Sequence, residues 1–564
     1  GQKTADLLPE LIEATLKKLV LGKTMRWGSY ETEFVRPVQW IVLLFGQETI
    51  NCKILGKTSE RSTRGHRFHH PEAIKLEKSN QYVEELRQHK VIADFNERRD
   101  TIRKLIEKAP LQQAQALIDE ELLTEVTGLV EWPTLHVGHF DRRFLDIPQE
   151  VLICSMKTHQ KTFPMANKAG QLQAYFVVIS NIDSKKPLAI VSGNERVINA
   201  RLSDAEFFYQ NDLKHKLEDY LPRLKALVFQ KELGSIYDKT QRMSHNAEHI
   251  AKLINVDTDI AKRAALLAKC DLLSEMVKEF PELQGIMGYY YALHHHETDA
   301  CAKAIREHYQ PRFSGDAVAE SEVGAVVALA DKLDTLVGIL GINKKPTGDK
   351  DPFALRRCAL GIIRTLLEKE FSLDLMDLLK ATAKSYKTKL ANNEVVEESF
   401  AFIMERLKAW YAEQDISADV FEAVRSKNPT DLLDFAKRIK AVKEFQLLPE
   451  AASLAAANKR VNNILKKQTS KSAHKVHEEL LQDKAELELW KKLHALQAKV
   501  NKAYEAKDYN ETLCLLSTLK EPVDQFFEDI MIMADDKKLR DNRLALLEEL
   551  NHLFGLVADL SVLQ

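Results

Sequence analysis

The chain has 564 residues, which is too long for one ordinary domain; at roughly 150 residues per domain it predicts about three to five. It carries 81 Lys and Arg against 83 Asp and Glu, a formal net charge of −2. That balance excludes a globally basic nucleic-acid coat and an acidic disordered tail. The hydrophobic content of 45% is sufficient for sizeable cores and excludes wholesale disorder.

The first 200 or so residues predict an α+β unit. Residues 9–22 have the pattern of an amphipathic helix, and residues 37–56 predict two strands flanking a turn at Gly46. Residues 80–118 are charged and periodic and therefore predict helices. Residues 122–140 and 172–183 are rich in residues typical of strands.

The pattern becomes helical from about residue 201. Residues 260–279 have apolar positions at helical spacing, and residues 322–341 are apolar on nearly all sides, which predicts a central helix. Residues 342–352 form the clearest linker. Of the chain's 20 glycines and 16 prolines, residues 353–564 contain only two and three, respectively, which predicts an all-helical region.

Six cysteines are scattered without a CxxC motif, which argues against a zinc ribbon or a disulfide scaffold and suits a reducing cytosol. No apolar run approaches the length of a membrane span. The opening residues lack both Met and a signal-peptide pattern. We therefore expect the chain to begin inside a longer protein or after a removed tag.

A set of polar residues in the helical middle region has the order of a metal site. His245 and His249 lie at i, i+4 on one predicted helix, and Asp331 lies on a later one. This order resembles the HD superfamily of metal-dependent phosphohydrolases, in which a His-Asp pair supplies two central ligands. Here that position is Ala268-Lys269, and because alanine cannot ligate and an ammonium repels a cation, we expect an HD-like fold with a degenerate site and no metal.

The tail from Ala451 has features of a nucleic-acid module. Residues 451–471 carry five basic residues and no acidic ones, and the sequence from Lys459 to Ile464 mixes cations with amides. Arg540, Asn542 and Arg543 form a second polar cluster. A solvated face on a helix bundle remains the alternative for both clusters.

Several long segments extend this interpretation. They include MRWG (25–28), VLICSMKTHQKTFP (151–164), GNERVINARLSDAEFFY (193–209), RAALLAKCDLLSEMVKEFPELQGIMGYYYA (263–292) and FFEDIMIMADDKKLRDNRLALL (526–547). Through such segments the chain resembles, nearly end to end, the β-subunit family of bacterial tetrameric glycyl-tRNA synthetases. Family chains carry a further opening segment, which fits the expectation about the start of this chain.

The resemblance implies a multidomain, mainly α architecture. Residues 1–200 would be an N-terminally truncated α+β tRNA-contacting domain similar to B3/B4 of phenylalanyl-tRNA synthetase, and residues 201–345 the HD-like helical domain. Residues 346–454 would be a helical linker or body. Residues 455–564 would be an α-helical anticodon-binding bundle similar to that of arginyl-tRNA synthetase.

The resemblance also implies a division of labour in an α2β2 heterotetramer. The α subunit holds ATP, Mg and glycine, while this chain binds tRNA-Gly, binds no cofactor itself and works in the cytoplasm without a membrane or DNA partner. No HIGH sequence is present, and Lys466–Ser472 only faintly echoes a KMSKS loop, so an adenylate-forming site is expected to be absent.

Two groups of residues are the candidate tRNA contacts. The anticodon arm is assigned to Lys459, Arg460, Asn462, Asn463, Lys466, Arg540 and Arg543. Lys350, Arg356 and Arg357 lie in the KDPFALRR segment and could equally contact the tRNA backbone or pair with acids between domains. The alternatives to tRNA binding are an HD-type metal phosphohydrolase and a helical scaffold without an RNA role.

Overall fold

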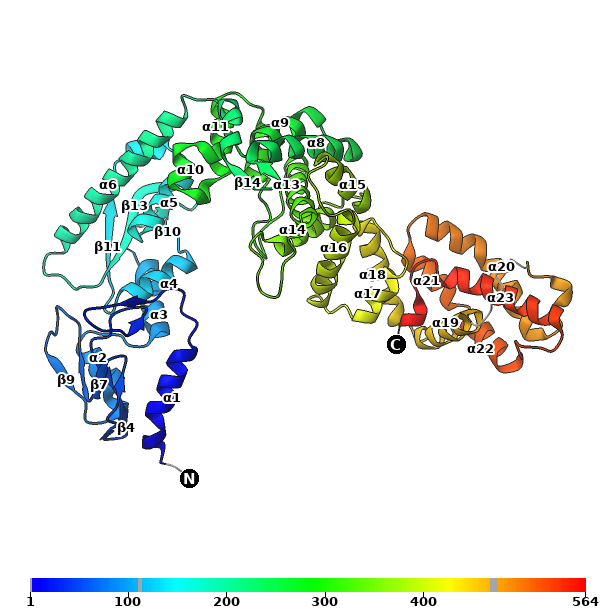
Figure 1. Cartoon of the computed structure of the whole chain (residues 1–564), viewed down its shortest axis with the longest axis horizontal. Coiled ribbons are helices and arrows are strands. Elements are labelled where there is room, and N and C mark those ends of the chain that lie inside the picture. The colour runs from blue at the N-terminus through cyan, green and yellow to red at the C-terminus, as the bar shows by residue number, and fades with distance from the viewer. Residues whose placement is uncertain (1–2, 110–113, 467–474, 564) are drawn as a thin grey trace. The chain divides into compact units, whose positions relative to one another are not determined.

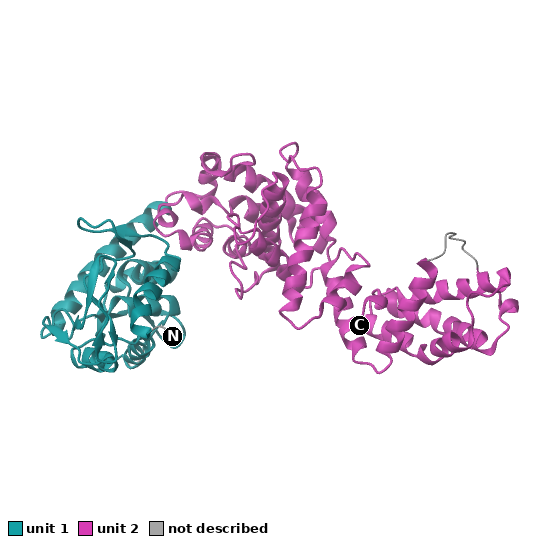
Figure 2. Ribbon diagram, turned by 60° about the horizontal axis from the view of Figure 1, so that its bottom comes forward, with its two compact units in different colours: residues 1–212 teal, residues 213–564 magenta. Residues whose placement is uncertain are grey.

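The computed structural model of the chain describes residues 3–109, 114–466 and 475–563. The chain divides into two compact units, residues 1–212 and residues 213–564 (Figure 2). Unit 1 combines strands and helices. In the described part of unit 2, the only strands are those of a two-stranded ribbon, β14 (Val228–Gln230) and β15 (Gly234–Ser235). The mixed front and helical remainder predicted from the sequence are both present.

The first part of unit 1 consists of helix α1 (Thr4–Lys18) followed by short strands. The turn predicted at Gly46 is confirmed, because this residue adopts a φ of +62° between the paired strands β4 and β5. Ile74, Leu76 and Leu86 form a small core beneath these strands and helix α2 (Tyr82–Gln88). The strands are β1 (Met25–Arg26), β2 (Glu33–Phe34), β3 (Ile41–Val42), β4 (Leu44–Phe45), β5 (Glu48–Thr49), β6 (Lys53–Ile54), β7 (Lys57–Glu60), β8 (Ser62–Arg64) and β9 (Ala73–Lys75).

A four-stranded antiparallel sheet forms the second part of unit 1, in the order β10-β12-β13-β11. Its strands are β10 (Gln115–Ala116), β11 (Thr134–His139), β12 (Phe163–Ala166) and β13 (Leu172–Ser180). Val177 on β13 pairs with Val137 on one side and Phe163 on the other. The helices around this sheet are α3 (Phe95–Glu107), α4 (Glu120–Leu129), α5 (Gln149–Gln160) and α6 (Pro187–Asp212) (Figure 1).

One expectation for unit 1 was wrong, since the first half of the segment 122–140 is helix α4 and not a strand. Asp119 caps this helix by accepting a hydrogen bond from the Leu122 amide at 2.9 Å. Leu122, Leu123 and Val126 then fall on one helical face and are buried in the core beside β12 and β13. The helical spacing of these residues and the cap outweigh their strand propensity.

Helix α13 (Glu322–Gly341) is the centre of unit 2, as the sequence predicted. Most of its residues are buried, and α8, α9, α12, α14, α15 and α16 pack around it (Figure 1). The helices that precede it are α7 (Leu217–Tyr220), α8 (Ile236–Ile254), α9 (Thr258–Leu267), α10 (Glu275–Glu279), α11 (Ile286–His294) and α12 (Asp299–Glu307).

The segment 260–279, which we predicted as one helix, is interrupted. Helix α9 ends at Leu267, a short 3-10 turn follows, and α10 restarts after Ser274, whose hydroxyl accepts from the Val277 amide at 3.2 Å. The carboxylate of Asp271 lies in the interruption and accepts hydrogen bonds from two backbone amides at the start of α11. Asp271 is therefore committed to a tertiary contact and does not lie on the surface of a continuous helix.

The region poor in glycine and proline is helical, and no strand occurs in the described residues after 353. Its first helices form a body, α14–α18, and its last form a terminal bundle, α19–α23 (Figure 1). The helices are α14 (Leu355–Glu368), α15 (Leu375–Ser385), α16 (Val395–Ala412), α17 (Ala418–Arg425), α18 (Leu432–Gln446), α19 (Ala451–Lys466), α20 (Lys484–Glu505), α21 (Tyr509–Ser517), α22 (Lys520–Asp529) and α23 (Lys537–Phe554). Among all the described helices, none is both long and apolar enough to cross a bilayer.

Candidate functional site

A buried cluster of opposite charges lies where α8 and the segment after α9 meet α13. The two carboxylate oxygens of Asp331 pair with Lys239 Nζ at 2.8 Å and with Lys269 Nζ at 2.9 Å. Lys239 also lies 3.2 Å from Asp334, which pairs with Arg242 at 2.6 Å. We call these five residues the Asp331 cluster.

The Asp331 cluster is held together by mutual compensation of buried charge. Burial alone would raise the pKa of Asp331, but the ammonium groups of Lys239 and Lys269 outweigh burial and hold this pKa well below its ordinary value. Burial, together with the positive charge of Lys239, lowers the pKa of Lys269. Each ion in the cluster therefore depends on its partners to remain charged.

The residues of the Asp331 cluster do not fit a metal ion. Lys269 pairs with Asp331, and Ala268 beside it is fully buried and offers no donor. His245 is not brought to Asp331; it lies on the exposed side of α8, and Lys239 of the same helix makes the contact instead. Among the described residues, no group of three or more His, Cys, Asp or Glu side chains is arranged to hold a metal ion.

Two further buried polar residues beside the Asp331 cluster were missed from the sequence. Asp271 accepts hydrogen bonds from the amides of Gly285 (2.5 Å) and Gly288 (3.0 Å), and burial raises the pKa of this carboxyl to about 6. His308 lies 2.6 Å from the Ile305 carbonyl through Nδ1, and burial lowers its pKa well below the ordinary value. No local pattern marks either residue, since both are surrounded by ordinary helical sequence.

One face of α19 in the terminal bundle gathers several of the predicted tRNA contacts. Lys459, Asn463 and Lys466 are exposed at i, i+4 and i+7, and their side chains form no hydrogen bond or ion pair with any described residue. Arg460 is exposed next to them, with its guanidinium 4.5 Å from the ring centre of Phe527. We call these four residues the α19 face. Residues 467–472 of the KMSKS-like sequence lie outside the described residues.

The remaining predicted contacts of the bundle point elsewhere. The Asn462 amide donates to Ser561 Oγ at 3.0 Å, and Arg540 donates to the Ala534 carbonyl at 3.4 Å. Arg543 is buried, where it pairs with Asp483 at 3.0 Å and also with Glu486.

Asn542, beside Arg543, is also buried and exchanges hydrogen bonds with the backbone of His477 at 2.7 and 3.1 Å. The structure therefore gives Arg543 and Asn542 structural roles inside the bundle. Burial of the Arg543 guanidinium corrects its assignment as an anticodon contact.

The linker residues divide in a similar way. Lys350 is exposed, and its backbone pairs with that of Thr347. Arg356 donates to the Gly348 carbonyl, and Arg357 donates to the Arg312 carbonyl at 3.1 Å. Arg356 thus ties the linker to α14, whereas Arg357 ties α14 to the segment before α13, and neither forms an ion pair with a described acid.

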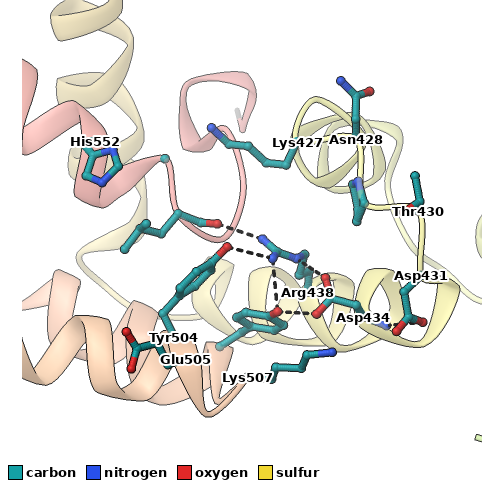
Figure 3. A pocket seen from close by; sticks show the side chains of 14 residues that line it. Lys427, Asn428, Thr430, Asp431, Asp434, Arg438, Tyr504, Glu505, Lys507 and His552 are labelled. Carbon is teal, nitrogen blue, oxygen red and sulfur yellow. Dashed lines mark hydrogen bonds and ion pairs between the residues drawn. The ribbon is translucent and has the colours of Figure 1, made fainter. Parts of the chain in front are cut away.

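Arg438 of α18 connects the body to the terminal bundle. Figure 3 shows its guanidinium between Asp434 of the same helix and the side chain of Tyr504 from the bundle. It pairs with Asp434 at 2.7 Å and donates to the hydroxyl of Tyr509 at 3.2 Å and to the Leu556 carbonyl at 2.8 Å. These bonds join α18 to residues 66 to 119 positions further along the chain, so they fix the bundle to the body.

Comparison with known proteins decides what this arrangement belongs to. Residues 1–426 match the family model of the glycyl-tRNA synthetase beta subunit, and residues 454–560 match the model of the DALR anticodon binding domain. The chain belongs to the glycyl-tRNA synthetase β-subunit family.

Curated relatives carry the same family name. The glycine–tRNA ligase beta subunit of Coxiella burnetii (strain Dugway 5J108-111) is 54% identical across 100% of this chain and 82% of its own length. Those of Colwellia psychrerythraea and Pseudomonas fluorescens are each 46% identical over the same shares. Membership of this β-subunit family makes the chain part of an aminoacyl-tRNA synthetase, and it disfavours an HD-type phosphohydrolase.

The family assignment also gives the terminal bundle a role. Helices α20–α23 lie within the DALR anticodon-binding match, as does the α19 face. Arg438 lies between the two matched segments, 1–426 and 454–560, and its hydrogen bonds reach into the second. The α19 face is therefore part of a domain whose family binds anticodons.

Proposed function

We propose that this β subunit binds tRNA-Gly through its DALR domain and presents the tRNA 3′ end to a separate α subunit, which performs ATP-dependent glycylation. The observation that carries the proposal is the α19 face, where three cationic side chains and an amide lie exposed on the anticodon-binding domain. Cations can contact phosphates, while an amide can read base edges of an unpaired loop.

The chemical contribution of this chain would be positioning. In glycyl transfer the attacking group is a ribose hydroxyl of the tRNA, so the β subunit needs no nucleophile of its own. Holding the 3′ end near glycyl-adenylate makes the transfer effectively intramolecular. In this account ATP and Mg are bound by the α subunit, the assembly is an α2β2 heterotetramer in the cytoplasm, and residues 1–200 add contacts towards the acceptor stem.

A second part of the proposal concerns the middle of the chain. We propose that the helices around α13 keep an HD-type arrangement whose metal has been replaced by lysines. The support is the position of Lys269, which is the second residue of the degenerate pair and occupies one oxygen of Asp331. An ion pair at that oxygen maintains the helix packing without hydrolytic chemistry.

The test of tRNA binding neutralises the α19 face. Lys459→Ala/Arg460→Ala should weaken binding of tRNA-Gly and reduce the slope of log Kd against log salt by up to about two. The matched control is Lys499→Ala/Lys502→Ala, which removes two exposed lysines from α20 of the same domain. Unchanged tRNA affinity and salt slope in the α19 variant would refute the assignment of the α19 face as a tRNA contact. Circular dichroism of the variant checks that the domain stays folded without the contact between Arg460 and Phe527.

A further inference from the structure

A groove of about 840 Å³ runs between α8 and α15 in unit 2. Helix α8 contributes His245 and His249 to its lining, and the end of α15 and the turn after it contribute Lys384 and Lys387. His245 and His249 lie one helical turn apart, so their imidazoles share the same face of α8. None of these four residues belongs to the α19 face or to the Asp331 cluster.

The base of the groove is rigid. Arg242 lies 4.0 Å from the ring centre of Tyr386 and is paired with Asp334 beneath. The Tyr386 hydroxyl donates to the backbone carbonyl of the same aspartate at 2.7 Å. The Asp331 cluster thus fixes α8 and α15 relative to α13, and the lining side chains project from a preformed frame.

The acidic residues of the groove are already neutralised. Glu248 pairs with Lys252 at 2.7 Å and with Lys262 at 3.1 Å, and hydrogen bonds from these lysines lower its pKa to about 2. Asp238 accepts from the backbone amide of Ser235 at 2.8 Å as part of the cap of α8, and it lies 4.0 Å from the ammonium of Lys389.

Two of the three lysines at the opposite side have no such partners; the third, Lys389, lies 4.0 Å from Asp238 and donates to the Leu233 carbonyl. Across the described ranges, the side chains of Lys384 and Lys387 form no hydrogen bond or ion pair, and both residues are exposed. His245 and His249 are likewise free of described partners. The groove therefore presents excess positive charge and unused N–H donors, which makes it complementary to a polyanion.

We propose that this groove binds a phosphodiester backbone, as a second RNA contact of the β subunit apart from the DALR domain. The lining favours RNA over a protein partner, because its side chains end in charged or polar groups, with Ala381 as the exception. The core of a protein interface is depleted in charge, whereas nucleic-acid interfaces are polar, wet and positive. The inference rests on the proposed tRNA-binding function and adds a site to it.

The experiment compares two double variants of the full chain. Lys384→Gln/Lys387→Gln removes the unpaired cations of the groove, and Lys380→Gln/Lys440→Gln removes two exposed lysines outside it. By counterion release, each lost phosphate contact is worth about eightfold in affinity at 0.1 M salt. The groove variant should therefore bind tRNA-Gly roughly 10- to 60-fold more weakly, with a salt slope reduced by about two, while the control binds like the unmodified chain.

A labelling measurement places the contact without substitution. In the unmodified chain, saturating tRNA-Gly should protect Lys384 and Lys387 from an amine-reactive reagent but leave Lys380 reactive. Wild-type affinity and slope in the groove variant, with no protection, would overturn the groove while leaving the α19 face intact. A groove variant that binds tRNA normally but no longer binds the α subunit would also overturn the proposal, because the groove would then be a protein interface. Failure of the unmodified chain to bind tRNA would instead overturn the proposed function itself.

Discussion

Asp331→Asn is the sharpest test of the claim that lysines have replaced a metal around α13. The substitution preserves side-chain size but removes the charge shared by Lys239 and Lys269. Lys239 retains Asp334 at 3.2 Å, whereas Asp331 is the carboxylate with which Lys269 pairs. The buried ammonium of Lys269 must then remain uncompensated or lose its proton.

The size of the destabilisation follows from the second of these outcomes, in which Lys269 loses its proton. Neutralising a lysine of ordinary pKa at pH 7 costs about 5 kcal/mol, which caps the penalty, and breaking a buried ion pair costs about 3–5 kcal/mol. The pKa of Lys269 is already lowered by burial in the unmodified chain, and without the Asp331 charge it should fall further, so that the native variant binds fewer protons than its unfolded state. Its stability should therefore rise with pH, and the deficit relative to the unmodified chain should shrink between pH 7 and pH 9.

Hydrogen exchange of the α13 amides provides the assay, because it reports the opening of this helix separately from the rest of a multidomain chain. The matched control is Asp299→Asn, which breaks the exposed Lys303–Asp299 pair of α12 at 2.8 Å and should leave exchange unchanged. The reasoning is refuted if the α13 amides of Asp331→Asn exchange at pH 7 as they do in the unmodified chain. It is also refuted if the loss of stability in the variant does not change with pH.

Two further predictions concern the other buried groups. Burial raises the pKa of Asp271 to about 6, so its stabilising contribution is present below its unfolded pKa and lost as pH rises from there through 6. Asp271→Asn should remove about 1.4 kcal/mol of that pH dependence in thermal unfolding between pH 5 and pH 8, and an unchanged pH profile would contradict this. Arg438→Met leaves Asp434 buried without its cation and should destabilise the junction of α18 with the DALR domain by about 3–5 kcal/mol, measured as faster exchange in α18 and α21. Arg425→Met on the neighbouring helix, whose side chain is 43% exposed, is the control, and equal effects of the two substitutions would speak against the junction.

Features that depend on local pattern could be predicted from the sequence. The scarcity of glycine and proline after residue 353 correctly gave a helical region, and the continuous apolar character of residues 322–341 gave the central helix α13. The β4–β5 turn followed from Gly46. In each case one residue type or one periodicity is sufficient to specify the structure.

Features that depend on distant partners could not be predicted. Arg543 and Lys459 are both cations on helices of mixed polarity, yet one pairs with Glu486, 57 positions away, and the other is exposed. Lys239 reaches Asp334 across 95 positions of the chain. The order of residues in the HD superfamily therefore placed His245 in the site, and Lys239 was missed. Helical periodicity shows that a face exists but does not specify which residue of another helix will meet it.

Charging of tRNA-Gly tests the central claim most directly. The assay measures glycyl-tRNA formation by this chain alone, by a glycyl-tRNA synthetase α subunit alone, and by the two together, with ATP, Mg and glycine in each. Because we propose that this chain binds the tRNA and that the α subunit forms the adenylate, we predict efficient charging only when both chains are present. Glycyl-tRNA formed by this chain alone, or no gain when it is added to the α subunit, would contradict the account.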